Sequence, residues 1–298
     1  MDLRSQTISC GLSRRRRAYD MGLRALLYAS GLLICGLLVF LMGYILLRGV
    51  PNLSWQFLSS EESVIKGIEG ILPALINTLY VVVATLLIVL PLGVGSAIYL
   101  TEYAANKKLV SVIEFATETL AGMPSIIFAL VGVIVFCQFA GLGTSLLAGA
   151  LSLVMMTLPT LIRTTQESLK TVPRSYREGS LALGSGKWHM VRTVILPSSV
   201  DGIVTGCILA VGRIVGESAV LMFTAGMGMR LAKYGDTPGE FFKSLFDSSG
   251  ATLTVALYNY AKERADFDSA FAVAVVLLVI AFLINIAAKL AGRKLRKH

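Results

Sequence analysis

Charged residues are scarce in this sequence. Asp, Glu, Lys and Arg make up 15% of its 298 residues, against about 25% in a typical soluble domain. Histidine occurs only at His189 and His298, which disfavours a histidine-based metal site. The four cysteines form no C-x-x-C pair, and Cys35, Cys137 and Cys207 lie in apolar stretches where a thiol acts as a small hydrophobe. We therefore expect no catalytic residue, metal ligand or redox pair.

The sequence also lacks a nucleotide-binding loop. The run Gly184-Ser185-Gly186-Lys187 matches only the end of a Walker A loop, which reads G-x-x-x-x-G-K-[ST]. Residue 181 is Leu instead of Gly, and residue 188 is Trp instead of Ser or Thr. We therefore expect this chain to bind no cofactor and any ATP-Mg to be bound by a partner subunit.

Long apolar runs take the place of charge, and 55% of the residues are hydrophobic. The runs cover residues 25–47, 71–100, 119–162, 202–225 and 269–288. A bilayer crossing needs about 20 apolar residues, so the third run is long enough for two crossings, with a turn at the glycines of residues 141–144. Helices satisfy their own backbone hydrogen bonds in lipid. The sequence therefore predicts an all-α, polytopic integral membrane protein with six transmembrane helices.

The net charge of +9 is explained by membrane topology. If both termini are cytoplasmic, most of the 27 Lys and Arg residues fall on the cytoplasmic side, including Arg14–Arg17 and the basic tail at residues 293–297. This favours contact with membrane lipid over binding of nucleic acid. The first run is longer than the apolar core of a signal peptide, which is about 7–15 residues, so we expect it to be retained as a transmembrane helix.

The chain divides by composition into four parts. We expect a basic cytoplasmic tail at residues 1–23, the first transmembrane helix and an outer loop at 24–66, a transmembrane core at 67–290, and a second basic cytoplasmic tail at 291–298. Pro124 lies inside a predicted span and should kink it, because proline removes a backbone donor and clashes with the preceding turn.

An amphipathic loop at residues 163–199 interrupts the core on the predicted inner side. Pro173 is suited to the start of a helix and Gly184 to its end. A second short helix is predicted over residues 187–195, ending before Pro197. Two such helices would project as a knob that docks into a partner, and an ordinary interfacial amphipathic helix is the alternative.

This loop resembles the EAA loop of ABC importer permeases, in which Glu-Ala-Ala is followed by Gly and then by Leu-Pro. The two alanines are replaced here by Gly179 and Ser180, which are also small. The resemblance implies a type I importer permease core of the MetI-like kind, whose loop docks into a groove on an ATP-binding subunit and transmits its movement. The implied docking residues are Glu178, Gly179, Ser180, Ala182, Gly184, Leu196 and Pro197.

Two charges interrupt the predicted fifth span, Arg213 and Glu217. Each costs about 2.5–3.5 kcal/mol near the bilayer centre on insertion scales. Their spacing of four predicts that they share one helix face. One interpretation is a structural pair that neutralises itself. The other is an anion path, in which the guanidinium binds an oxyanion and Glu217 competes for the guanidinium, so that the anion is released.

The sequence around these charges is similar to the phosphate permeases of the PstA family. The similar segments are residues 98–103, 118–126, 162–169 and 212–225, and the resemblance extends from about residue 67 to the tail. It implies that Arg213 and Glu217 line a path for phosphate, with Glu118 and Glu114 as weaker candidates.

The same resemblance implies a bacterial inner-membrane complex. Its partners would be a second permease (PstC-like), two ATP-binding subunits (PstB-like) and an extracytoplasmic phosphate-binding protein (PstS-like). The nearest alternative is a permease for another oxyanion such as sulfate. A stand-alone channel or carrier would have no use for the inner loop, and a membrane enzyme would need a nucleophile–base pair that the sequence does not contain.

Overall fold

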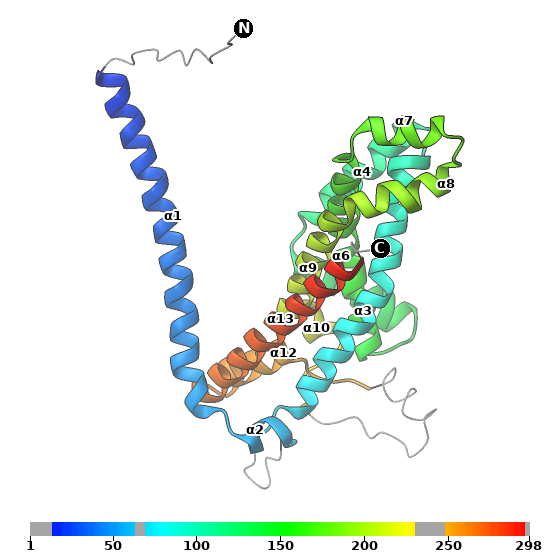
Figure 1. Ribbon diagram of the computed structural model, residues 1–298. Helices are drawn as coiled ribbons and strands as arrows, with labels where there is room; N and C mark the ends of the chain where they lie inside the picture. The colour runs from blue at the N-terminus through cyan, green and yellow to red at the C-terminus, as the bar shows by residue number, and fades with distance from the viewer. Residues whose placement is uncertain (1–13, 63–68, 230–247, 296–298) are drawn as a thin grey trace. The chain divides into compact units, whose positions relative to one another are not determined.

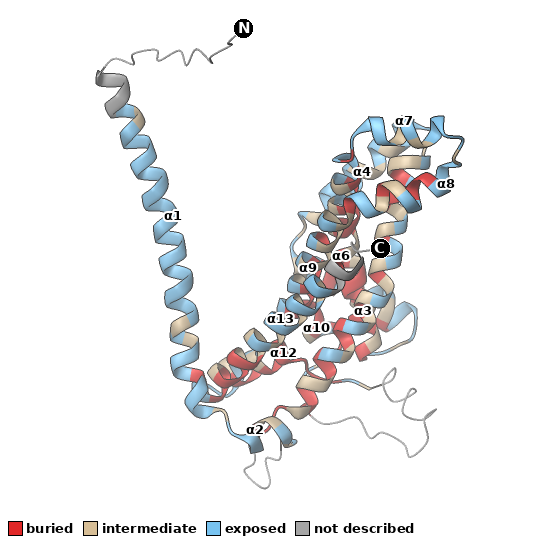
Figure 2. Ribbon diagram, viewed as in Figure 1, coloured by how far each residue is buried: buried red, intermediate tan, exposed pale blue. Residues whose placement is uncertain are grey.

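The structure is a computed structural model, and it describes residues 14–62, 69–229 and 248–295 (Figure 1). The chain divides into two compact units, residues 1–48 and 49–298. The described part of the first unit belongs to one helix, α1 (Arg14–Gly49), whose apolar side chains are exposed (Figure 2). The predicted tail is therefore helical from Arg14 onward, which fits the good helix propensity of consecutive arginines.

The second unit contains no strand in its described residues, and the all-α prediction is confirmed. Its elements are η1 (Val50–Asn52), α2 (Trp55–Ser59), α3 (Leu72–Ile98), η2 (Tyr99–Tyr103), α4 (Lys107–Ala121), α5 (Ser125–Gly132), η3 (Val133–Phe139), α6 (Leu146–Lys170), α7 (Arg174–Ala182), α8 (Lys187–Met190), η4 (Val191–Ile195), α9 (Leu196–Gly216), α10 (Ala219–Thr224), α12 (Leu253–Tyr258), η5 (Asn259–Glu263) and α13 (Phe267–Leu295). The elements η2 to η5 are π-helical turns that continue the helices before them.

Helix α6 is the centre of this unit. It packs against α3, α4, α5 and α9, and 67% of its most apolar window is buried. Two glycines of α9, Gly202 and Gly206, lie directly against Ser168 and Thr164 of α6, where a β-carbon would have no room. Small residues of this kind let two membrane helices approach closely. The close approach aligns the rest of α9 along α6.

Six crossings are compatible with the structure. Helices long and apolar enough to cross a membrane cover Tyr19–Asn52, Leu72–Tyr103, Leu146–Lys170, Lys187–Gly216 and Phe267–Leu290. The sixth is a pair, α4 with α5–η3, bent by 101°. The kink predicted at Pro124 is thus a complete break, with Pro124 in an extended conformation (ψ 139°). The predicted turn is confirmed as well, since Gly141 and Gly143 both have positive φ.

The loop helices differ from the prediction at Pro197. The predicted second helix does not end there, because α8, η4 and α9 form one continuous helix from Lys187 to Gly216. The π-helical turn η4 ends two residues before the proline, and Leu196 N–H donates to the carbonyl of Val191, five residues back. This change of register accommodates a residue without a backbone donor, so the helix continues.

Helices α7 and α8 lie together at one end of the second unit, which we call the loop end (residues 171–190) (Figure 1). Helix α2 and the start of α13 lie toward the opposite end (Figure 1). Candidate residues from the fifth span and the α4–α5 break are therefore carried by helices that pack on α6, whereas those of the loop end are carried by α7 and the helix that follows it.

Candidate functional site

Arg213 lies in the last turn of α9 and is half-buried. Its Nη1 donates a hydrogen bond to Thr160 Oγ1 of α6 at 3.0 Å. The C-terminal turn of a helix carries a partial negative charge, which favours a cation at this position. The guanidinium thus has a neutral hydroxyl as its hydrogen-bond partner, and its positive charge is not cancelled by that contact.

Glu217 does not share a helix face with Arg213, so this prediction is wrong. Helix α9 ends at Gly216, and Glu217 is extended with φ −82° and ψ 124°. No ion pair joins the two side chains in the part of the chain that the structure describes. The pattern of four-residue spacing predicts contact only within an unbroken helix, and the break separates them.

Glu217 instead holds the break together. Its carboxylate accepts a hydrogen bond from the backbone N–H of Val220 at 3.2 Å, which caps the start of α10. Its backbone carbonyl accepts the hydroxyl of Thr254 at 2.8 Å. Irregular backbone at membrane depth is stable only when such polar groups are satisfied by protein. Thr254 is the second residue of α12 and lies 37 residues after Glu217 in the sequence, so the sequence did not predict this contact.

Glu118, the third predicted path residue, is ion-paired near the end of α4. Its Oε1 lies 2.7 Å from Arg163 Nη1 of α6, and Arg163 also contacts Glu167 at 3.1 Å. Glu114 pairs in a similar way with Lys170 at 2.9 Å. These residues line a hollow of about 170 Å³ that also includes Thr117 and Gln166. Glu118 is therefore paired with Arg163, which it shares with Glu167.

Helix α6 brings the two groups of residues together. Thr160, the partner of Arg213, and Arg163, the partner of Glu118, are three residues apart on α6. Side chains at this spacing are neighbours on a helix surface. One stretch of α6 thus contacts the end of α9 on one side and α4, just before its break, on the other. No sequence pattern singles out Thr160, because threonine is common in membrane helices.

The loop end exposes small and apolar residues. Gly184 has φ +81° and follows the end of α7, as predicted, because glycine adopts this backbone conformation without strain. Leu183 is 91% exposed and Trp188 is 60% exposed. Of the predicted docking residues, Glu178, Gly179, Ala182, Gly184 and Pro197 are exposed, whereas Ser180 and Leu196 are half-buried. A hollow of about 790 Å³ lies between α7 and the start of the following helix.

An ion pair that no sequence pattern predicts joins the loop end to η2. Arg177 of α7 pairs with Glu102 of η2, with Nη2 and Oε1 2.9 Å apart. The two side chains are only 19% and 7% exposed, respectively. Both residues are visible in the sequence as charges beside apolar segments, but only the fold shows that residues 75 positions apart meet.

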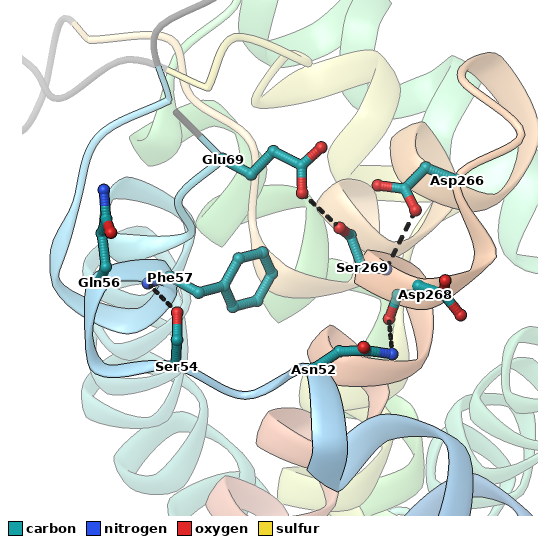
Figure 3. A pocket seen from close by; sticks show the side chains of 8 residues that line it. All are labelled: Asn52, Ser54, Gln56, Phe57, Glu69, Asp266, Asp268 and Ser269. Atoms are coloured by element: carbon teal, nitrogen blue, oxygen red, sulfur yellow. Dashed lines mark hydrogen bonds between the residues drawn. The ribbon is translucent and has the colours of Figure 1, made fainter. Parts of the chain in front are cut away.

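A polar pocket of about 480 Å³ lies toward the opposite end of the second unit, near α2 and the start of α13 (Figure 3). It is lined by Asn52, Ser54, Gln56, Phe57, Glu69, Asp266, Asp268 and Ser269. The Ser269 hydroxyl donates to Glu69 at 2.7 Å, and the Ser269 N–H donates to Asp266 at 3.2 Å (Figure 3). Within the described residues, no group of three or more His, Cys, Asp or Glu side chains is placed to hold a metal ion.

Comparison with known proteins identifies the family. Residues 89–297 match the profile of the binding-protein-dependent transport system inner membrane component family. The probable ABC transporter permease protein YqgI of Bacillus subtilis is 42% identical over 195 residues, which are 65% of this chain and 66% of YqgI. The phosphate transport system permease protein PstA of Haemophilus influenzae is 29% identical over 279 residues, which are 92% of this chain and 94% of that protein.

Solved structures agree in fold. A bacterial ABC transporter that imports the acidic polysaccharide alginate has a chain with a TM-score of 0.62 and 16% identity, covering 94% of this chain and 99% of that one. A chain of the MetNI methionine ABC transporter has a TM-score of 0.54 and 21% identity, covering 85% and 97%. The profile match extends over more than half of the sequence. The chain therefore belongs to the binding-protein-dependent transport system inner membrane components, the transmembrane permease subunits of ABC importers.

Proposed function

We propose that this permease forms half of a transmembrane path for inorganic phosphate. The observation that carries the proposal is Arg213, a half-buried guanidinium at the end of α9 whose hydrogen bond goes to the neutral hydroxyl of Thr160. Its positive charge remains available to an oxyanion, and the planar fork matches phosphate oxygens bidentately. Relatives named PstA, 29–32% identical over 79–93% of this chain, support phosphate as that oxyanion.

The sequence predicted that Glu217 would release phosphate by competing for Arg213, and the structure favours a different explanation of release. Since Glu217 caps α10 instead of facing Arg213, it does not compete for the guanidinium. We infer that affinity for the anion is limited by the Thr160 contact, which occupies a donor of the guanidinium, and by the exposure of Arg213. Conduction needs binding that is favourable and still reversible.

A second permease subunit would complete the path. Gly212 and Gly216 flank Arg213 on an exposed surface, and a β-carbon built at either position meets no atom of this chain. Another helix can approach closely at such glycines. The path for phosphate would then lie between the two permeases, with Arg213 contributed from this side.

The exposed surface of the loop end supports an ATP-binding subunit as a further partner. The exposed apolar and small residues of α7 and the turn after it, including Leu183 and Gly184, suit docking on an ATP-binding subunit, because exposed apolar patches mark interaction sites. ATP-Mg would be bound and hydrolysed there, and not on this chain. An extracytoplasmic phosphate-binding protein would deliver phosphate from the other side of the membrane. We place the loop end, with both termini, on the cytoplasmic side of a bacterial inner membrane.

The test is uptake of radiolabelled phosphate by cells that express the whole importer and no other phosphate carrier. We expect Arg213→Ala to lower uptake by at least about tenfold, which corresponds to about 1.4 kcal/mol, with unchanged amounts of complex. Arg213→Lys should retain part of the activity, because it keeps the charge and loses the fork.

Competition identifies the oxyanion. Unlabelled phosphate should abolish uptake by the wild-type importer, and an equal excess of sulfate should leave it unchanged. Inhibition by sulfate would assign the path to another oxyanion, and normal uptake by Arg213→Ala would refute the role of the guanidinium.

A further inference from the structure

The helix proposed to meet the ATP-binding subunit has almost no apolar attachment to the rest of this chain. No residue of α7 is buried, and only Arg177 and Ser180 are even half-buried (Figure 2). The following helix is different. Met190, Val191 and Ile195 are buried in an apolar cluster with residues of η2 and α6. Helix α7 also lies against α8 and η4, so its movement can reach the transmembrane helices through these neighbours and through polar contacts.

Arg177 provides polar contacts to two of these helices. Its Nε and Nη2 donate to Glu102 Oε1 at 3.1 and 2.9 Å. Its Nη2 also donates to the carbonyl of Leu169 at 2.9 Å, and its Nη1 to the carbonyl of Val172 at 2.6 Å. Leu169 lies in the last turn of α6, where carbonyls lack partners within the helix. The guanidinium thus caps α6 while it pairs with Glu102.

Glu102 connects this contact to a second membrane helix. It lies in η2, the π-helical turn that continues α3, and its side chain is 7% exposed. The next residue, Tyr103, has the Lys187 ammonium 5.9 Å from its ring centre, so η2 contacts the start of α8 as well. An ion pair removed from water resists separation, because each charge left alone would be buried without a partner.

We infer that Arg177 is a positioning residue that transmits displacement of α7 to α3 and α6 together. The inference rests on the proposed docking of an ATP-binding subunit on α7. Closure of that subunit would move α7, and the guanidinium would carry the movement to the ends of both helices, one of which bears Thr160 and its contact to Arg213. Without the link, movement of α7 would reach α3 and α6 only through α8 and η4.

The experiment uses the whole importer reconstituted in liposomes with its binding protein. It measures phosphate transported per ATP hydrolysed, ATP hydrolysis with and without the binding protein, and the amount of ATP-binding subunit that co-purifies. The variants are Arg177→Ala, Arg177→Lys and Glu102→Gln. The matched control is Arg192→Ala, which removes an exposed arginine of η4.

We expect Arg177→Ala to lower the phosphate-to-ATP ratio at least tenfold and to abolish stimulation of hydrolysis by the binding protein, with the ATP-binding subunit retained. Lysine cannot reach the carboxylate and both carbonyls at once, so Arg177→Lys should fall between alanine and wild type. Glu102→Gln keeps the contacts to α6 and should lose less than Arg177→Ala. The control should match wild type.

Two outcomes would overturn the inference. One is a wild-type ratio in Arg177→Ala. The other is loss of the ATP-binding subunit from that variant, which would make Arg177 a docking residue. If the wild-type importer transports no phosphate, the proposed substrate fails separately, and stimulation of hydrolysis by the binding protein still decides the role of Arg177.

Discussion

At the scale of single residues, the environment of Arg213 is chemically simple. A hydroxyl on α6 orients the guanidinium, and the carboxylate four positions further along the chain faces away into a helix cap. The sequence identified both charges as unusual, and the residue types were enough for that. It did not reveal their separation, because the break after Gly216 depends on Thr254, which lies 37 residues from Glu217.

The Thr160 hydroxyl should tune the affinity for the anion. Thr160→Val keeps the side-chain shape and removes the acceptor for Arg213. A hydrogen bond to a charged group contributes about 1.5–3 kcal/mol. Because the substitution frees a guanidinium donor for the anion, we expect the apparent KM for phosphate to fall at least about fivefold. The control is Thr205→Val on exposed α9 surface, whose hydroxyl bonds its own helix. An unchanged KM in Thr160→Val would contradict the orienting role.

Glu217 should act through its cap and not through its charge. Glu217→Gln retains an oxygen acceptor for the Val220 N–H, whereas Glu217→Ala removes it and should cost about 1 kcal/mol of stability. We expect the melting temperature in detergent to fall for alanine and to stay close to wild type for glutamine, with uptake following the same order. Equal loss of uptake in both variants, at equal stability, would instead indicate a role for the negative charge.

At the scale of elements, local signals predicted local structure well. Apolar run lengths predicted the membrane helices, and Pro173 and Gly184 bracket α7 as expected, because capping depends on neighbouring residues only. Local sequence patterns did not predict two larger features, the continuous helix through Pro197 and the size of the break at Pro124. The continuous helix through Pro197 depends on a π-helical turn that no short motif marks. The 101° break at Pro124 is larger than the kink expected from proline alone.

The close packing of α9 on α6 should depend on Gly206. A β-carbon at this position would lie 2.5 Å from Thr164 Oγ1 and 3.2 Å from its Cβ, and overpacking of this kind typically costs about 1–3 kcal/mol. Gly206→Ala should therefore lower the melting temperature of the purified permease. Gly95→Ala, at a helical glycine with open space around it, is the control and should keep or raise it. Equal melting temperatures would show that α9 can shift without loss.

At the scale of the whole molecule, the second unit places different chemistry at its two ends. The loop end presents exposed Leu183 and Trp188, whereas the opposite end has the polar pocket of Figure 3. The sequence of residues 163–199 resembles the cytoplasmic loop of importer permeases, and the family predicted from it is confirmed. Substrate specificity is not readable from sequence patterns alone, because it depends on the few atoms around Arg213 and on the proposed partner subunit.

The two ends should differ in their effect on assembly. Leu183→Asp places a charge on the surface proposed to dock the ATP-binding subunit and should reduce co-purification of that subunit at least tenfold. Phe267→Asp alters an exposed aromatic at the start of α13 and should leave co-purification unchanged. Retention of the ATP-binding subunit by Leu183→Asp, or its loss from Phe267→Asp, would place the docking surface elsewhere.

The absence of buried residues in α7 has an evolutionary consequence. Substitutions on this short segment do not disturb the packed interior, so its outward side chains are free to change in step with those of the proposed ATP-binding partner. The position most constrained by the interior is Arg177, through its contacts to two carbonyls and a carboxylate. If α7 docks the ATP-binding subunit as proposed, we expect exchange of residues 174–185, with this arginine kept, to change which ATP-binding subunit the permease pairs with.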